Sequence, residues 1–155
     1  MIIKIKTEAV LEAWNILNGA TYKQLEDADK IKLWKIARVM KPIAKQFEDD
    51  SRDAAEKMKP ENLDENLAKA KEYEEKLRKG EKDNLPMTDD EYQTFIREVW
   101  SPFNRLVAEA VKEYAEKEVE LDIELLTEEA FGKLMASNDW QINKAMTLGE
   151  LIVVK

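Results

Sequence analysis

Two long stretches of this chain have the apolar spacing of an α-helix, and each contains a proline in its interior. Apolar side chains recur every three or four residues over 27–58, and again over 88–117, where they form the strongest apolar stripe in the sequence. Pro42 and Pro102 each remove a backbone donor and press a ring against the carbonyl four residues earlier, which costs ~3 kcal/mol or bends the helix. Both segments are therefore expected to be kinked helices.

The residues around the two prolines also resemble one another. Residues 96–105 repeat residues 36–45 at four positions, sixty places later in the chain. The matching residues are Ile36, Val39, Pro42 and Lys45, which return as Ile96, Val99, Pro102 and Arg105. Matched structural kinks would give a bowed, antiparallel helical hairpin. The alternative is that each helix bends around one core and the repeat is a coincidence, because wrapping a core is a common reason for helix curvature.

Two short segments alternate apolar and charged residues, which is typical of half-buried β-strands. They are residues 1–6 and residues 119–125. Lysines line the outer face of the first and acids that of the second, so pairing the two would set opposite charges side by side. The tail over 138–155 is ambiguous, and we expect a short helical turn that runs into a third strand at 151–154.

The segment over 49–83 is the most polar part of the chain, with 21 charged residues among 35. Several acids precede a base by four residues, the order that best supports an exposed helix. This segment is expected to be a charged helix on the surface or projecting from the body.

The whole prediction is one domain over 1–155 with an α+β, mostly α fold. It has a long antiparallel hairpin of proline-kinked helices and a small sheet of two or three strands that joins the termini to 119–125.

The composition excludes several kinds of chemistry. The chain has no cysteine and no histidine, so thiolate or imidazole zinc sites, disulfides and Cys–His or Ser–His–Asp catalysis are impossible. The four glycines are too far apart for a phosphate loop. The acidic runs lack the ligand spacing of a calcium loop. We expect no enzyme activity, no cofactor, no metal and no small-molecule substrate.

The formal net charge of −8 bears on partners. It argues against direct contact with nucleic acid or anionic lipid, where Lys and Arg neutralise phosphates. No stretch approaches the ~20 apolar residues of a membrane span, so no membrane association is expected. The charge leaves open a basic protein partner, with long-range attraction aiding the encounter.

The four tryptophans are the candidates for core or interface anchors. Trp14 and Trp34 lie beside apolar stripes and are expected in the core. Trp100 lies beside the apolar line of its helix and could flank a partner. Trp140 lies in a polar stretch and is the preferred interface candidate, with packing on the strands as the alternative.

The chain opens with a strand and short helix, KIKTEAVLEAWNILNGA, followed by a long charged helix, DKIKLWKIARVMKPIAKQFEDD. This start is similar to that of small uncharacterised helical proteins of tailed phages and prophages. The matching positions are Ile3, Ile5, Ala9, Leu11, Leu17, Gly19 and the helix over 30–47. The resemblance implies a phage assembly, virion or accessory protein, and it brings no catalytic residue.

The sequence therefore predicts a non-enzymatic interaction protein that binds a protein partner or copies of itself. The alternative is an acidic inhibitor of anti-defence type that occupies a basic site on a host enzyme. The expected location is the cytoplasm, that of the host cell if the protein is phage-encoded, or the virion. A salt titration would separate the two functions, because acidic mimicry weakens with ionic strength and an apolar interface does not.

Overall fold

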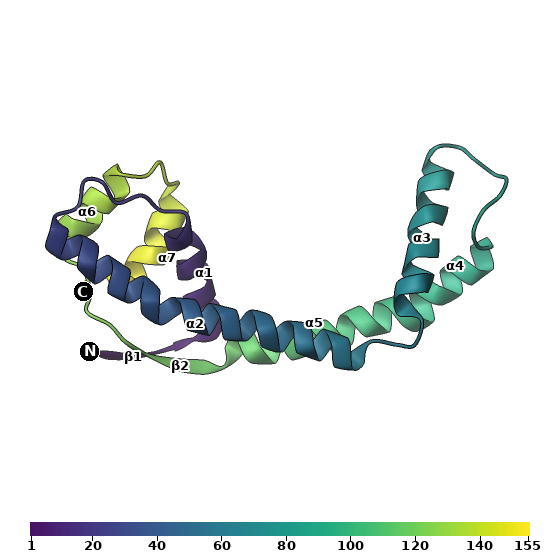
Figure 1. Ribbon diagram of the computed structural model, residues 1–155, viewed down its shortest axis with the longest axis horizontal. Helices are drawn as coiled ribbons and strands as arrows, with labels where there is room; N and C mark the ends of the chain where they lie inside the picture. The colour runs from purple at the N-terminus through teal and green to yellow at the C-terminus, as the bar shows by residue number, and fades with distance from the viewer. The chain divides into compact units, whose positions relative to one another are not determined.

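The structure is a computed structural model that describes all 155 residues (Figure 1). It is an α+β fold composed mostly of helices, with one small sheet, as the sequence predicts. Strand β1 (Ile2–Lys6) is followed by helices α1 (Thr7–Asn18), α2 (Asp27–Met58), α3 (Leu63–Arg78) and α4 (Asp89–Phe95). A π-helical turn, η1 (Ile96–Trp100), leads into α5 (Ser101–Glu116), and then come β2 (Glu118–Asp122), α6 (Glu128–Ala136) and α7 (Ile142–Ile152).

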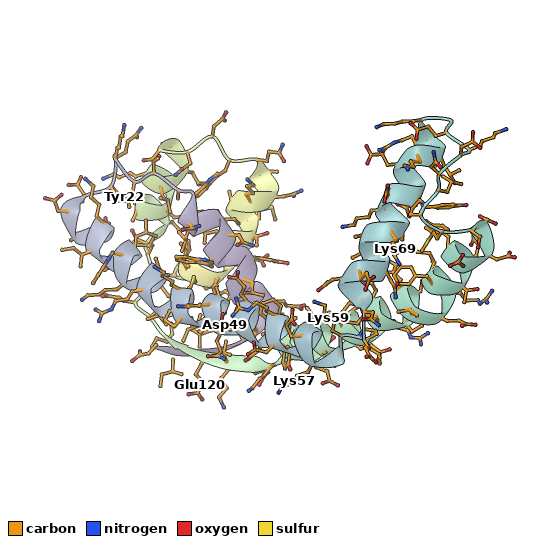
Figure 2. The ribbon with its side chains drawn as sticks, turned by 45° about the vertical axis from the view of Figure 1, so that its right-hand side comes forward. Tyr22, Asp49, Lys57, Lys59, Lys69 and Glu120 are labelled. Atoms are coloured by element: carbon orange, nitrogen blue, oxygen red, sulfur yellow. The ribbon has the colours of Figure 1, made fainter.

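The two predicted strands pair with each other. β1 and β2 are antiparallel, and their register places Lys4 opposite Glu120 and Lys6 opposite Glu118. The Lys4 ammonium lies 3.9 Å from the Glu120 carboxylate, and the Glu120 side chain projects from the ribbon of β2 (Figure 2). The inner face buries Leu121, with Ile3 and Ile5 partly covered. The prediction of pairing with opposed charges is confirmed.

The expected third strand is not a strand. Leu151 and Ile152 end helix α7, and Val153 alone forms an isolated parallel bridge with Leu126. Thr147, which fits a helix start in the sequence, lies inside α7 instead. The apolar positions of this helix bury Leu148, Leu151 and Ile152 at helical spacing. Four consecutive apolar residues fit the pattern of a helix and of a strand equally well. Burial of these residues against the core therefore determines that the segment is helical.

The chain divides into two compact units. The first comprises residues 1–50 and 113–155, and the second comprises residues 51–112. Helices α2 and α5 each contribute residues to both units. The single domain over 1–155 and the antiparallel hairpin of the two long helices stay predictions.

The first unit contains the larger core. Residues from α1, α2, α6, α7 and the sheet form it, and Val10, Met40, Leu121, Leu126 and Leu134 are among its fully buried side chains. Thr7 is the one polar residue among the buried ones. The sequence suggests Thr7 as a helix cap, but its side chain caps nothing and Lys6 occupies the N-cap position. The Thr7 hydroxyl instead donates to the Lys117 carbonyl at 2.7 Å.

The second unit has a smaller core between α3 and α4. Leu63, Ala70 and Phe95 are buried there, and Tyr73 packs against Tyr92 with ring centroids 4.8 Å apart. Thr88 and Glu91 have the sequence spacing of a capping box and form one, with Glu91 N–H bonded to Thr88 Oγ1 and Thr88 N–H bonded to the Glu91 carboxylate.

Helix α3 carries the predicted acid-first ion pairs along the charged segment. They are Glu65–Lys69, Glu72–Lys76 and Glu75–Lys79, at 3.8, 3.4 and 3.3 Å. All of these side chains except the partly buried Lys76 are exposed, so each pair contributes little stability by itself. The buried side of this helix, at Leu63, Ala70 and Tyr73, holds it to its neighbour.

The two prolines have different backbone surroundings. Pro42 lies inside α2, which continues past it as an α-helix to Met58. Pro102 follows η1, where the Ser101 N–H bonds to the Ile96 carbonyl five residues back. The helix predicted as continuous over 88–117 is therefore interrupted by one wide turn. Such turns relieve the clash that a proline ring makes with the carbonyl four residues before it.

Candidate functional site

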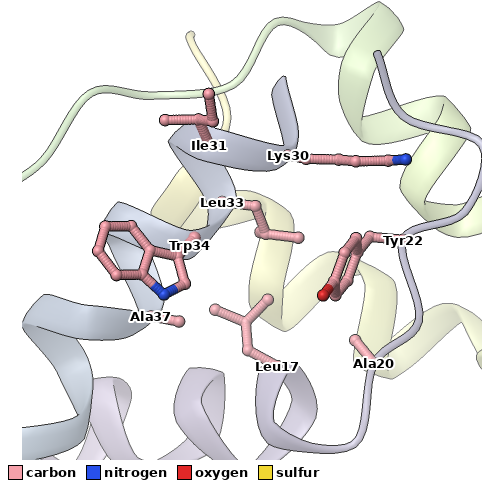
Figure 3. A pocket seen from close by; sticks show the side chains of 8 residues that line it. All are labelled: Leu17, Ala20, Tyr22, Lys30, Ile31, Leu33, Trp34 and Ala37. Carbon is pink, nitrogen blue, oxygen red and sulfur yellow. The ribbon is translucent and has the colours of Figure 1, made fainter. Parts of the chain in front are cut away.

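The clearest candidate site is a pocket of about 350 Å³ in the first unit. It lies between the end of α1, the connection that follows it and the first turns of α2 (Figure 3). Its lining residues are Leu17, Ala20, Tyr22, Lys30, Ile31, Leu33, Trp34 and Ala37. Figure 3 shows the Trp34 and Tyr22 rings on opposite sides, with Leu17 and Leu33 between them. We refer to this set as the Trp34 pocket.

Three large apolar side chains of the Trp34 pocket are exposed to solvent. Trp34 is 58% exposed, Ile31 is 55% exposed and Tyr22 is 52% exposed. Leu17 and Leu33, in contrast, are buried and belong to the core. An apolar floor with an exposed aromatic rim differs from isolated exposed side chains, which are normal on any protein. Tryptophan and tyrosine are also the residues that most often dominate protein interfaces.

The wall that carries Tyr22 is fixed by hydrogen bonds from the residue before it. The Thr21 hydroxyl donates to the Ser137 carbonyl at 2.5 Å, and the Thr21 N–H donates to Asn138 Oδ1 at 2.9 Å. Asn138 Nδ2 in turn donates to the Thr21 carbonyl at 2.8 Å. These contacts tie the connection after α1 to the end of α6, so the pocket wall is held by side chains distant in sequence.

Helix α2, which forms the other wall, carries two cationic side chains at this site. The Arg38 guanidinium lies 5.2 Å from the centre of the Trp34 ring, within the range of a cation–π contact. Lys30 lines the pocket, and its partly buried side chain makes a long ion pair, 3.9 Å, with the exposed carboxylate of Asp27. Lys133, which is not a lining residue, contacts Glu26 at 3.2 Å, and that hydrogen bond raises the pKa of Lys133.

A second apolar surface lies between α6 and α7. It is a groove of about 480 Å³, lined by Phe131, Met135, Ile142, Met146 and Val153 with Glu128 and Glu150 among the polar residues. Ile142 is 75% exposed and Met146 is 58% exposed. Gly149 faces the Phe131 ring, where an added Cβ would lie 3.2 Å from the ring, so a larger residue would crowd this groove.

The strongest pKa shift lies in the second unit, on Tyr92. A hydrogen bond from its hydroxyl to Glu74 raises the pKa of Tyr92 to about 12. Burial and a 3.0 Å hydrogen bond to Asp89 also raise the pKa of Tyr73. Both bonds join α3 to α4. Glu74 precedes Arg78 by four residues, the acid-first order that predicts an ion pair, but in the structure Glu74 accepts the hydrogen bond of Tyr92.

The structure places the predicted candidates as follows. Trp140 is half-buried and packs against the core of the first unit. Trp100 is half-buried in the second unit, with its ring 6.1 Å from that of Phe103. That Trp140 or Trp100 contacts a partner stays a prediction. Pro42 and Pro102 lie outside the Trp34 pocket, and their role as matched kinks also stays a prediction.

The expectation that Trp34 lies in the core is wrong. Leu33, Ile36 and Met40 are the buried residues of this part of α2. At ~100° per residue, Trp34 lies roughly 200° around the helix from Ile36, which places it on the opposite face. A helical wheel drawn from Ile36 and Met40 would have found it.

Comparisons with family models, with curated proteins and with solved structures find no match. No group of three or more acidic side chains is arranged to hold a metal ion. None of the helices combines the length and the apolar character needed to cross a bilayer. The Trp34 pocket is therefore interpreted from its own residues.

Proposed function

We propose that this protein is a non-enzymatic interaction protein that binds a protein partner through the Trp34 pocket. The single observation that carries the proposal is the exposed aromatic rim of Trp34 and Tyr22 over the buried floor of Leu17 and Leu33. A partner's aromatic or branched side chain would enter the pocket and displace water from both rings. Burying such a side chain contributes ~1.5–3 kcal/mol.

The chemistry of the lining supports binding more than catalysis. Lys30 is the one charged side chain in the lining, and its ammonium lies 3.9 Å from the Asp27 carboxylate. The Tyr22 phenol has no charged partner among the lining residues. A pocket whose one amine is paired with an acid, and whose other polar side chain is a tyrosine, suits an apolar anchor, as pockets at interface hot spots do.

The test is selection of peptides from a random displayed library on the whole chain. Peptides should be recovered that bind the wild-type protein and lose at least about thirtyfold affinity for Trp34→Ala, because truncating a hot spot costs ~2 kcal/mol or more. Met146→Ala is the matched control, since it removes an equally exposed apolar side chain (58%) outside the pocket. Circular dichroism should show that both variants fold.

Two results would contradict the proposal. One is a library that yields no peptide whose binding depends on Trp34. The other is equal loss of binding in Trp34→Ala and Met146→Ala, which would indicate general adhesion to exposed apolar side chains.

The second candidate, an acidic inhibitor of a basic enzyme site, draws support from a different segment. Residues 118–129 contain six acids and no base, and all six are exposed. Four of the six, Glu120, Asp122, Glu124 and Glu129, already have cationic neighbours within 4.0 Å, which reduces the charge available to a partner. Reversing Glu128 and Glu129 to Lys would abolish such inhibition and leave Trp34-dependent binding intact. A phage role stays a prediction from the sequence.

A further inference from the structure

The exposed face of α2 that carries Trp34 is basic, although the chain is acidic. Residues 30–45 contain six cations and no acid, in a protein of net charge −8. The six are Lys30, Lys32, Lys35, Arg38, Lys41 and Lys45. Exposed charges act over about one Debye length, ~10 Å, in ~0.1 M salt. The cations beside the apolar pocket therefore influence which partner binds there more than the net charge of the whole chain does.

Helix geometry aligns half of these cations with Trp34. At ~100° per residue, Arg38, Lys41 and Lys45 fall with Trp34 inside a sector of roughly 60°. All three are exposed. We call Arg38, Lys41 and Lys45 the cationic row. From Trp34 to Lys45 it extends roughly 16 Å along the helix axis, at 1.5 Å per residue.

No carboxylate of the protein forms an ion pair with the cationic row. Arg38 has the Trp34 ring as its neighbour, and Lys41 and Lys45 form no ion pair in the structure. Lys32, in contrast, contacts Glu124 at 3.4 Å. The row therefore presents three positive charges next to an apolar pocket, an arrangement complementary to a segment with an apolar anchor followed by acids.

We propose that the partner presents an acidic segment, with one aromatic or branched apolar side chain in the Trp34 pocket and carboxylates over the cationic row. This inference rests on the proposed function of the pocket. An extended segment advances ~3.3 Å per residue, so about five residues cover the row. A nucleic acid fits less well, because Leu17 and Leu33 form an apolar floor with no side-chain donor or acceptor for a base edge.

The test uses the peptides recovered from the library on the whole chain. Peptides that depend on Trp34 should be enriched in Asp and Glu on one side of an apolar anchor. The double variant Lys41→Glu, Lys45→Glu should weaken them by about tenfold or more at ~0.1 M salt, and less at high salt. Lys144→Glu, Lys155→Glu is the matched control, because it changes the net charge equally at exposed lysines outside this face.

Each other outcome has a distinct meaning. Trp34-dependent peptides that are neutral or basic overturn the inference and leave the proposed function standing, whereas no Trp34-dependent peptide overturns both. If the two double variants weaken peptide binding equally, the effect comes from the net charge of the protein and the inference is overturned. A single-stranded oligonucleotide that binds tighter than the peptides, and is lost in Lys41→Glu, Lys45→Glu, assigns the face to nucleic acid. Self-association that the same variant abolishes, measured by sedimentation, assigns the face to a second copy.

Discussion

The Thr7 hydroxyl donates a 2.7 Å hydrogen bond to the backbone carbonyl of Lys117, 110 positions further along the chain. The Thr7 N–H bonds to the same carbonyl at 2.9 Å. Thr7 is the first residue after β1, and Lys117 is the last before β2. The two bonds thus extend the antiparallel pairing by one step at the point where β1 ends and α1 begins.

The buried hydroxyl of Thr7 should contribute measurably to stability. Thr7→Val keeps the shape of the side chain and removes the donor, so the free energy of unfolding should fall by about 1 kcal/mol, the net value of one hydrogen bond. Thr147→Val is the matched control in the same unit, because the Thr147 hydroxyl makes no hydrogen bond, and its change should stay within about 0.5 kcal/mol. Urea denaturation measures both. Equal urea midpoints for Thr7→Val and the wild type would show that the hydrogen bond from the Thr7 hydroxyl does not stabilise the fold.

The charge register of the sheet gives a second prediction. Lys4 lies opposite Glu120 and Lys6 opposite Glu118, so changing both lysines to Glu should destabilise the fold by roughly 0.5–2 kcal/mol. Adding Glu118→Lys and Glu120→Lys restores opposite charges in swapped positions and should recover most of the loss. Thermal unfolding of the double and quadruple variants measures the coupling. A quadruple variant less stable than the double one would show that the register is different.

Alkaline pH should weaken the contact between α3 and α4. The pKa of Tyr92 is raised to about 12 by its bond to Glu74, above the unfolded value of about 10. Stabilisation from this bond is therefore fully present below pH 10 and is lost as pH rises through about 12. Unfolding measured across this range should show the loss in the wild-type protein and a smaller one in Tyr92→Phe. A tyrosinate absorbance titration should show one late-titrating tyrosine fewer in Tyr92→Phe than in the wild type. The same number in both proteins would contradict the raised pKa of Tyr92.

Local signals were sufficient to predict much of the fold from the sequence. The alternation of Ile3 and Ile5 with lysines, and of Leu121 with acids, defines both strands because a strand has a period of two. Thr88 and Thr127 start helices because each side chain accepts a backbone N–H bond three residues later. These signals involve neighbours in sequence, so no tertiary information is needed to recognise them.

The features missed by sequence reasoning depend on tertiary packing. Thr7 resembles a cap in the sequence, but the carbonyl that accepts its hydroxyl lies 110 positions away. Leu151 and Ile152 are helical because the core covers them at helical spacing. The Trp34 pocket needs Tyr22 from a connection that is held by Asn138, and no periodic pattern places those residues together.

The two prolines give the last prediction, because their backbone surroundings differ although four positions around them correspond. Pro42 is exposed inside a continuous α-helix, where a proline leaves the carbonyl four residues back without its donor. Pro102 follows a π-helical turn that already bonds Ser101 to Ile96. Pro42→Ala should therefore raise the free energy of unfolding by about 1–3 kcal/mol, since a proline in a helix interior is ~3 kcal/mol less favourable than alanine.

Pro102→Ala should gain clearly less, within about 1 kcal/mol, because the wide turn has already relieved most of the strain. Urea unfolding of the two single variants under the same conditions makes the comparison, and circular dichroism reports whether either variant gains helix. Equal gains from both substitutions would contradict this account of the π-helical turn. They would instead support the matched kinks that the repeat of residues 36–45 in 96–105 predicts, since equivalent strain should be released equally at equivalent positions.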